Sequence, residues 1–77
     1  MSDFRIWGRI THVGPSEFLA VVSAVPDDGI QRGPDPIVRT ALSDSLEQAK
    51  GDLEVLTVVV GDAIRAQGGR VVDVLSE

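Results

Sequence analysis

The sequence predicts a two-layer α+β sandwich, in which an antiparallel sheet carries one long helix on one face in the order β-β-β-α-β. Two observations lead to this fold. Four segments, residues 4–11, 17–25, 37–42 and 70–75, have the alternation or the valine-rich composition of strands. One longer segment, residues 45–67, has apolar residues at helical spacing. With 77 residues and no internal repeat, the chain is expected to form a single domain over residues 1–77.

The first two strands are expected to form a hairpin. Residues 4–11 place Phe4 and Ile6 in alternation with polar residues, so one face of this strand points toward a core. A turn follows at residues 14–16, Gly-Pro-Ser. Residues 17–25 are apolar on both faces, which is typical of a central strand. The third strand is short and begins after Pro36, which fixes the backbone there.

The helix is predicted from a stripe of apolar side chains and from signals at both ends. The stripe follows spacings of three and four residues: Leu46, Ala49, Leu53, Leu56, Val60 and Ala63. Ser45 with Gln48 three residues later has the spacing of a capping box, and Gly68-Gly69 is a typical C-terminal stop. The alternative is a strand near residues 56–60, flanked by Gly51 and Gly61. Burial of the stripe, about 1.5–3 kcal/mol per large side chain, outweighs the glycine cost of about 1 kcal/mol each. We expect one helix, which can kink or end early near Gly61.

Three valines of this helix, Val55, Val58 and Val59, lie beside the stripe. Two interpretations are open: the long loop covers them, or they form a contact with another subunit. A core of small aliphatic residues in so short a chain often gains stability from a partner subunit. We therefore expect a homodimer or a higher oligomer, with these valines as its contact.

Composition excludes several classes of protein. Twelve acidic against seven basic residues give a net charge of −5, which disfavours binding to nucleic acid and to anionic membranes. No apolar run approaches the roughly 20 residues of a membrane span, and residues 1–12 lack the pattern of a signal peptide. The absence of cysteine excludes disulfides and thiolate zinc sites. A cytoplasmic protein without membrane contact is expected.

No residue cluster indicates catalysis. His12 is the only histidine, and in the alternation of its strand it falls on the same face as the core residues. No Ser, Asp or Glu can be assigned to it as a catalytic partner from its spacing in the sequence. The loop of residues 26–36 contains Asp27, Asp28 and Asp35, but without the ligand spacing of an EF-hand. The glycines match no phosphate-binding pattern. The sequence thus predicts a protein that is not an enzyme and has no metal site and no cofactor.

The first strand presents a more informative face. Arg5, Trp7 and Arg9 project opposite the predicted core face, and Arg39 joins them if the register of the third strand allows. Tryptophan beside arginine is typical of protein contact sites. It also occurs on surfaces that stack single-stranded RNA. The third interpretation is an exposed face where arginine stems cover the tryptophan and nothing binds. The overall acidity places nucleic acid last.

The element order and a few local motifs resemble the partial RNase H-like domain of the HicB antitoxin family. The closest match is residues 44–49, Asp-Ser-Leu-Glu-Gln-Ala, which is similar to the opening of that family's single helix. Residues 23–26, Ser-Ala-Val-Pro, look like the end of its second strand, and residues 38–42 lie where it has a short third strand. The family's leucine-proline-glycine-cysteine turn is absent here. Its C-terminal DNA-binding domain is also not expected in a chain that ends at Glu77.

The resemblance implies a non-catalytic antitoxin-like domain that occludes a small partner. Complementary charge orients association, so the expected partner is a small basic toxin, contacted through Arg5, Trp7, Arg9 and the acidic loop. The alternative is an RNA-binding module, or an oligomeric domain of unknown function, that uses the same strand face.

Overall fold

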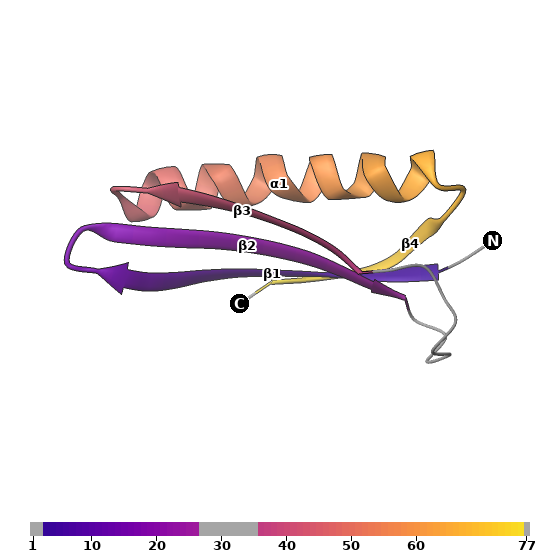
Figure 1. Cartoon of the computed structure of the whole chain (residues 1–77), viewed down its shortest axis with the longest axis horizontal. Coiled ribbons are helices and arrows are strands. Elements are labelled where there is room, and N and C mark those ends of the chain that lie inside the picture. The colour runs from indigo at the N-terminus through magenta and orange to yellow at the C-terminus, as the bar shows by residue number, and fades with distance from the viewer. Residues whose placement is uncertain (1–2, 27–35, 77) are drawn as a thin grey trace.

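The computed structural model describes residues 3–26 and 36–76. It contains five elements in the predicted order, namely β1 (Asp3–Gly14), β2 (Glu17–Pro26), β3 (Ile37–Ser43), α1 (Leu46–Ala66) and β4 (Arg70–Ser76). The helix packs lengthwise on one face of the sheet, as Figure 1 shows. The two-layer α+β sandwich is thus confirmed. The predicted acidic loop, with Asp27, Asp28 and Asp35, lies outside the described residues.

The sheet is mixed, whereas the sequence predicted an antiparallel one. Its strand order is β3-β2-β1-β4, and β1 pairs antiparallel with β2 but parallel with β4. The reason is geometric. Each element reverses the direction of the previous one, so β4 runs in the same direction as β1 and β3. Because both edges of β2 are already paired, β4 can join only a strand parallel to itself.

The helix is continuous from Leu46 to Ala66, through both glycines and the β-branched run of residues 57–60. At its start, the backbone N–H of Gln48 donates to Ser45 Oγ at 3.2 Å. At its end, Gly68 has a φ of 79° and the N–H of Gly69 donates to the carbonyl of Ile64 at 2.9 Å. This is the Schellman arrangement that the double glycine predicted.

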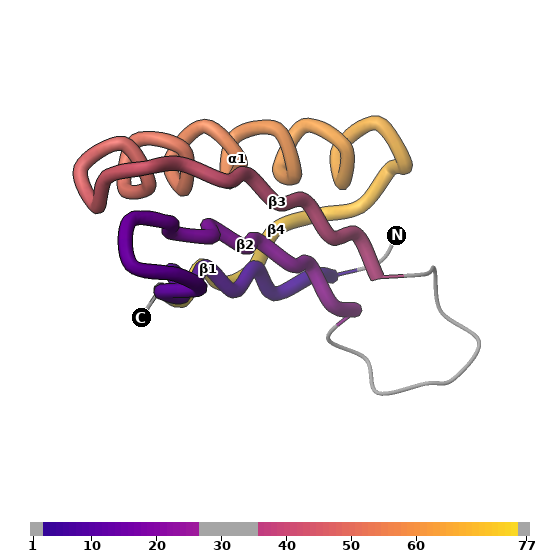
Figure 2. The backbone as a smooth tube through the Cα atoms, turned by 60° about the vertical axis from the view of Figure 1, so that its left-hand side comes forward, coloured from indigo at the N-terminus to yellow at the C-terminus, as the bar shows by residue number. Residues whose placement is uncertain are grey.

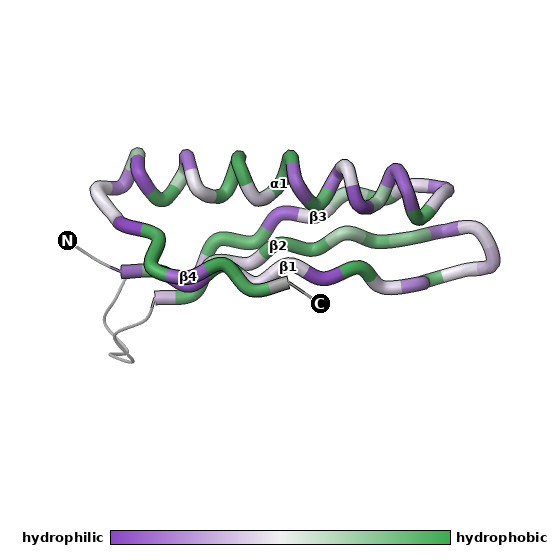
Figure 3. Tube along the Cα trace, turned by 180° about the vertical axis from the view of Figure 1, so that it is seen from behind, coloured by the Kyte–Doolittle hydropathy of each residue, from purple (hydrophilic) through white to green (hydrophobic). Residues whose placement is uncertain are grey.

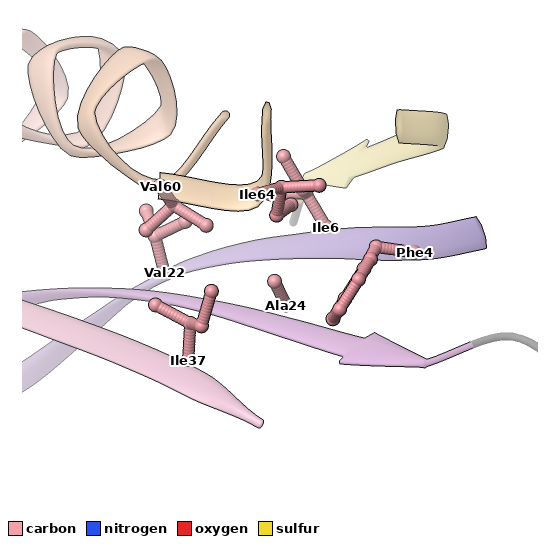
Figure 4. Packing of buried hydrophobic residues seen from close by; sticks show 7 residues of the cluster. All are labelled: Phe4, Ile6, Val22, Ala24, Ile37, Val60 and Ile64. Atoms are coloured by element: carbon pink, nitrogen blue, oxygen red, sulfur yellow. The ribbon is translucent and has the colours of Figure 1, made fainter. Parts of the chain in front are cut away.

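The core lies between the helix and the sheet (Figure 4). It contains seven buried residues: Phe4, Ile6, Val22, Ala24, Ile37, Val60 and Ile64. Burying such side chains contributes about 1.5–3 kcal/mol each, which is the main term that holds the two layers together. Among the described residues, no buried side-chain nitrogen or oxygen lacks a hydrogen bond, so the core carries no polar penalty.

The predicted stripe is correct in the middle of the helix and shifts at both ends. Leu46 is 45% exposed, although it is the first residue of the predicted stripe. At the other end Ile64 is fully buried, whereas the predicted stripe contained its neighbour Ala63. The stripe followed a repeat of 3.5 residues per turn. A straight helix has 3.6, so the buried side drifts by about 20° every seven residues. Over the length of α1 this drift moves the buried position from Ala63 to Ile64.

Candidate interaction surface

The face of the sheet that is turned away from α1 is uncovered within the described part of the chain (Figure 2). We call it the open face. Alternation along each strand assigns thirteen side chains to it: Arg5, Trp7, Arg9, Thr11, Leu19, Val21, Ser23, Val25, Val38, Thr40, Leu42, Asp73 and Leu75. None of them is buried. The open face is therefore a surface that the described part of the fold leaves without a packing layer.

Cross-strand pairing arranges these side chains in rows. The register places Trp7 opposite Ser23 on one side and opposite Leu75 on the other, and Val38 lies opposite Ser23. Trp7 is 45% exposed and lines a shallow hollow of about 240 Å³ together with Arg9 and Val21. The hollow thus lies on the open face, at the pairing of β1 with β2.

The open face is more apolar than the first strand alone predicted. Val25, Val38 and Leu42 all lie on it, with exposed fractions of 42%, 50% and 61%. Figure 3 shows apolar residues along the sheet strands as well as along the helix. Sequence reasoning did not name these three residues. The available signal was the apolar character of residues 17–25 on both faces, which requires a second covering layer that this chain does not supply from its described residues.

The charged side chains on this face are two arginines, Arg5 and Arg9, and one aspartate, Asp73. Arg5 lies opposite Asp73 in the register of β1 and β4, and Arg9 lies opposite Val21. The acidic side chains Glu47, Asp52, Glu54 and Asp62 are on α1, on the other side of the sheet. The open face is thus an apolar centre with two arginines, in a chain whose net charge is −5.

Arg39 does not join Arg5, Trp7 and Arg9. The register pairs it with Val22, which is fully buried beneath the helix, so Arg39 belongs to the helix side of the sheet. Its Nη1 donates to the carbonyl of Val38 at 2.8 Å. The sequence left the register of β3 open, and a shift of one residue moves every side chain of a strand to the other face.

The three helix valines are exposed. Val55, Val58 and Val59 have exposed fractions of 62%, 63% and 44%, and no described residue covers them. Val58 lies on the side of the helix directly away from the sheet, because it is about 180° around the helix from the buried Ala49 and Val60. Val55 and Val59 lie on a flank instead.

His12 is exposed, whereas its parity suggested the edge of the core. Its ring stacks on Phe18, with ring centroids 4.6 Å apart and planes 7° apart. The two residues face each other across the β1–β2 hairpin, just before the register shifts. This contact packs the His12 ring against β2 at the end of the hairpin.

Residues 3–26 and 36–76 contain no group of three His, Cys, Asp or Glu side chains close enough to hold a metal ion. In the same part of the chain, no helix has the length and apolarity needed to cross a membrane.

Comparison with known proteins adds no relative. No family model, no curated protein and no solved structure matches the chain. The resemblance to HicB-like antitoxins therefore stays a prediction.

Proposed function

We propose that this protein is a non-catalytic interaction module that binds another protein through the open face of its sheet. The observation that carries the proposal is the exposed apolar centre of that face, where Trp7, Val25, Val38 and Leu42 lie without a covering layer. Large apolar side chains that gather on one surface, with tryptophan and arginine among them, are the composition of protein contact sites.

The proposed partner is a small basic protein, and the mechanism is occlusion. The net charge of −5 attracts a basic partner at long range and orients it, while the apolar face provides the contact that excludes water. A basic toxin, the partner that the resemblance to HicB-like antitoxins implies, fits this chemistry. In that case the module inhibits by covering the partner's working surface and needs no catalytic group of its own.

Single-stranded RNA is the second candidate, and one observation favours it. Trp7 is exposed on a sheet face between Arg5 and Arg9, an arrangement in which a base can stack on the indole. The charge of the whole chain opposes it, since Asp73 lies beside Arg5 and the chain as a whole repels phosphates.

The test uses the purified chain and two probes. The first probe is a small basic protein that co-purifies with the tagged chain from the source cells, then isolated and titrated back. The second is a fluorescent single-stranded RNA of mixed sequence. We expect Trp7→Ala to weaken protein binding by about 2 kcal/mol or more, the size of a contact hot spot, and Val58→Ala on the far side of the helix to leave it unchanged.

The salt dependence separates the two candidates. Binding of the basic protein should persist at physiological salt, because its centre is apolar. RNA bound at physiological salt and lost on Trp7→Ala, with no basic protein recovered, would show that the second candidate is correct.

A further inference from the structure

Strand β3 is an edge strand without the usual protection. Within the described sheet it pairs only with β2, so its other edge presents unpaired backbone groups. Edge strands are commonly blunted by bulges, prolines or several charges. The opposite edge strand, β4, has a register shift against β1 and the charged Asp73. By contrast, β3 pairs with β2 without a shift, has no internal proline and contains one charged residue, Arg39.

We propose that β3 pairs antiparallel with β3 of a second copy of this chain, across a two-fold axis at Thr40. The two four-stranded sheets then become one continuous sheet, with both helices on the same face. This inference does not require the proposed function, because it uses the backbone edge of β3, although the side chains that it pairs, Val38 and Leu42, also lie on the open face.

The side chains of β3 are complementary to themselves in this register. Val38 of one copy lies opposite Leu42 of the other, and this pair occurs twice. In the single chain, Val38 is 50% exposed and Leu42 is 61% exposed, so the pairing buries the most exposed apolar residues of the strand.

Neighbouring registers are worse. An axis at Arg39 places the two Arg39 guanidinium groups directly opposite each other, which is destabilising. An axis at Ala41 pairs Leu42 with Thr40 and moves Val38 opposite Asp44, beyond the end of the strand. Of these three registers, only the axis at Thr40 pairs apolar side chains on the open face and keeps like charges from facing each other directly.

One exposed valine of the helix, Val59, lies on the same side of the molecule as β3. The helix flank that faces β4 is identified by a groove in which Lys50, Leu53 and Thr57 lie with Val74 of β4. At 100° per residue, Lys50 is about 80° from the buried Val60 in one direction around the helix axis, and Val59 is about 100° from Val60 in the other. Because β3 is at the opposite edge of the sheet from β4, Val59 lies on the flank toward the second copy, and Val55 lies between Val59 and the outward Val58.

Charge supports the same arrangement. Asp52 lies on the flank of Val59, six residues from the helix start, or about 9 Å along the axis. Ala41 is two residues before the end of β3, or about 7 Å, so Asp52 is at its level. The proposed register places Arg39 of the second copy opposite Ala41, on the helix side of the sheet. Each Arg39 thus approaches Asp52 of the other copy.

Sedimentation equilibrium of the full chain tests this proposal. We expect a monomer–dimer equilibrium in the wild type. Val38→Lys alone and Leu42→Glu alone should each raise the dimer dissociation constant roughly tenfold or more, because each places a charge opposite an apolar side chain twice per dimer. Circular dichroism checks that both variants stay folded, and Val58→Lys, on the outward side of the helix, should leave dimerisation unchanged.

An equimolar mixture of the two variants makes the test specific for the register. In the mixed dimer, the ammonium introduced at position 38 of one copy faces the carboxylate introduced at position 42 of the other. The second pair is the native one, Leu42 of the first copy opposite Val38 of the second. We expect the mixture to dimerise more tightly than either variant alone. A wild type that is monomeric at all concentrations would overturn the proposal. So would a dimer that Val38→Lys and Leu42→Glu leave intact, or that Trp7→Ala or Val58→Lys dissociates.

Discussion

Gly69 packs against the ring of Phe4 so closely that a β-carbon at this position would lie 2.8 Å from Phe4 Cε1 and 2.9 Å from Ile64 Cγ2. The contact is at the point where the chain leaves the helix and enters β4. It joins the segment after α1 to Phe4, the first buried residue of β1, although Phe4 and Gly69 are 65 positions apart in the sequence. The lack of a side chain at Gly69 is thus a packing requirement.

Replacing this glycine should destabilise the fold. Gly69→Ala forces the Phe4 ring or Ile64 to move and should lower the free energy of unfolding by about 1–3 kcal/mol, the usual range for overpacking. Gly51→Ala is the matched control, because a β-carbon there meets no atom within 4 Å. It should raise stability by up to about 1 kcal/mol through helix propensity. Urea unfolding followed by circular dichroism measures both. Equal stability of Gly69→Ala and the wild type would contradict the packing described.

The orientation of the helix gives a second prediction. Ile64 is fully buried and Val58 is 63% exposed. Ile64→Ala should therefore cost about 2–5 kcal/mol, whereas Val58→Ala should change stability by less than about 0.5 kcal/mol. Chemical denaturation of the two variants at equal concentration compares them. Similar losses from both substitutions would mean that the helix is rotated relative to the sheet.

The elements themselves could be predicted because their signals are local. Each signal determines the structure of only a few neighbouring residues. Examples are Ser45 at the start of the helix, Gly68-Gly69 at its end and the alternation in residues 4–11. The β-branched residues 57–60 were the ambiguous part. They are helical, and Thr57 Oγ1 donates to the carbonyl of Leu53 at 2.8 Å, which satisfies its hydroxyl inside the helix.

The relations between elements were harder to predict. Arg39 was expected on the face of Trp7 only if the register of β3 allowed it, and the register places it on the other face. That register sets which side chains of β3 share a face with the buried Val22, and no local pattern determines it. By contrast, the parallel pairing of β4 follows from counting chain reversals, once β2 is known to be central. The common face of Arg5, Trp7 and Arg9 was predictable because it lies within one strand.

The helix cap provides a third prediction. Ser45 Oγ accepts from the N–H of Gln48 at 3.2 Å, and this side chain is exposed. Ser45→Ala should lower the free energy of unfolding by about 0.5–2 kcal/mol, because it removes this hydrogen bond. Ser45→Asp should keep most of the stability of the wild type, since a carboxylate also accepts the hydrogen bond and is favoured at the positive end of the helix dipole. Thermal unfolding compares the two. A loss of the same size in both variants would show that the hydroxyl acts through some other contact.

The only tryptophan of the chain makes the open face observable without a label. Trp7 is 45% exposed, so collisional quenching of its fluorescence by acrylamide should be efficient in the free protein. A partner that covers the open face must reduce this quenching, because it removes the indole from solvent. Pairing along β3 should not reduce the quenching, since β2 lies between β3 and β1 in the sheet. Dilution through the monomer–dimer transition should therefore leave the quenching constant unchanged, while saturation with a basic protein partner should lower it. A bound partner that leaves the quenching constant at its free value would place the contact elsewhere, and the proposed role of the open face would be wrong.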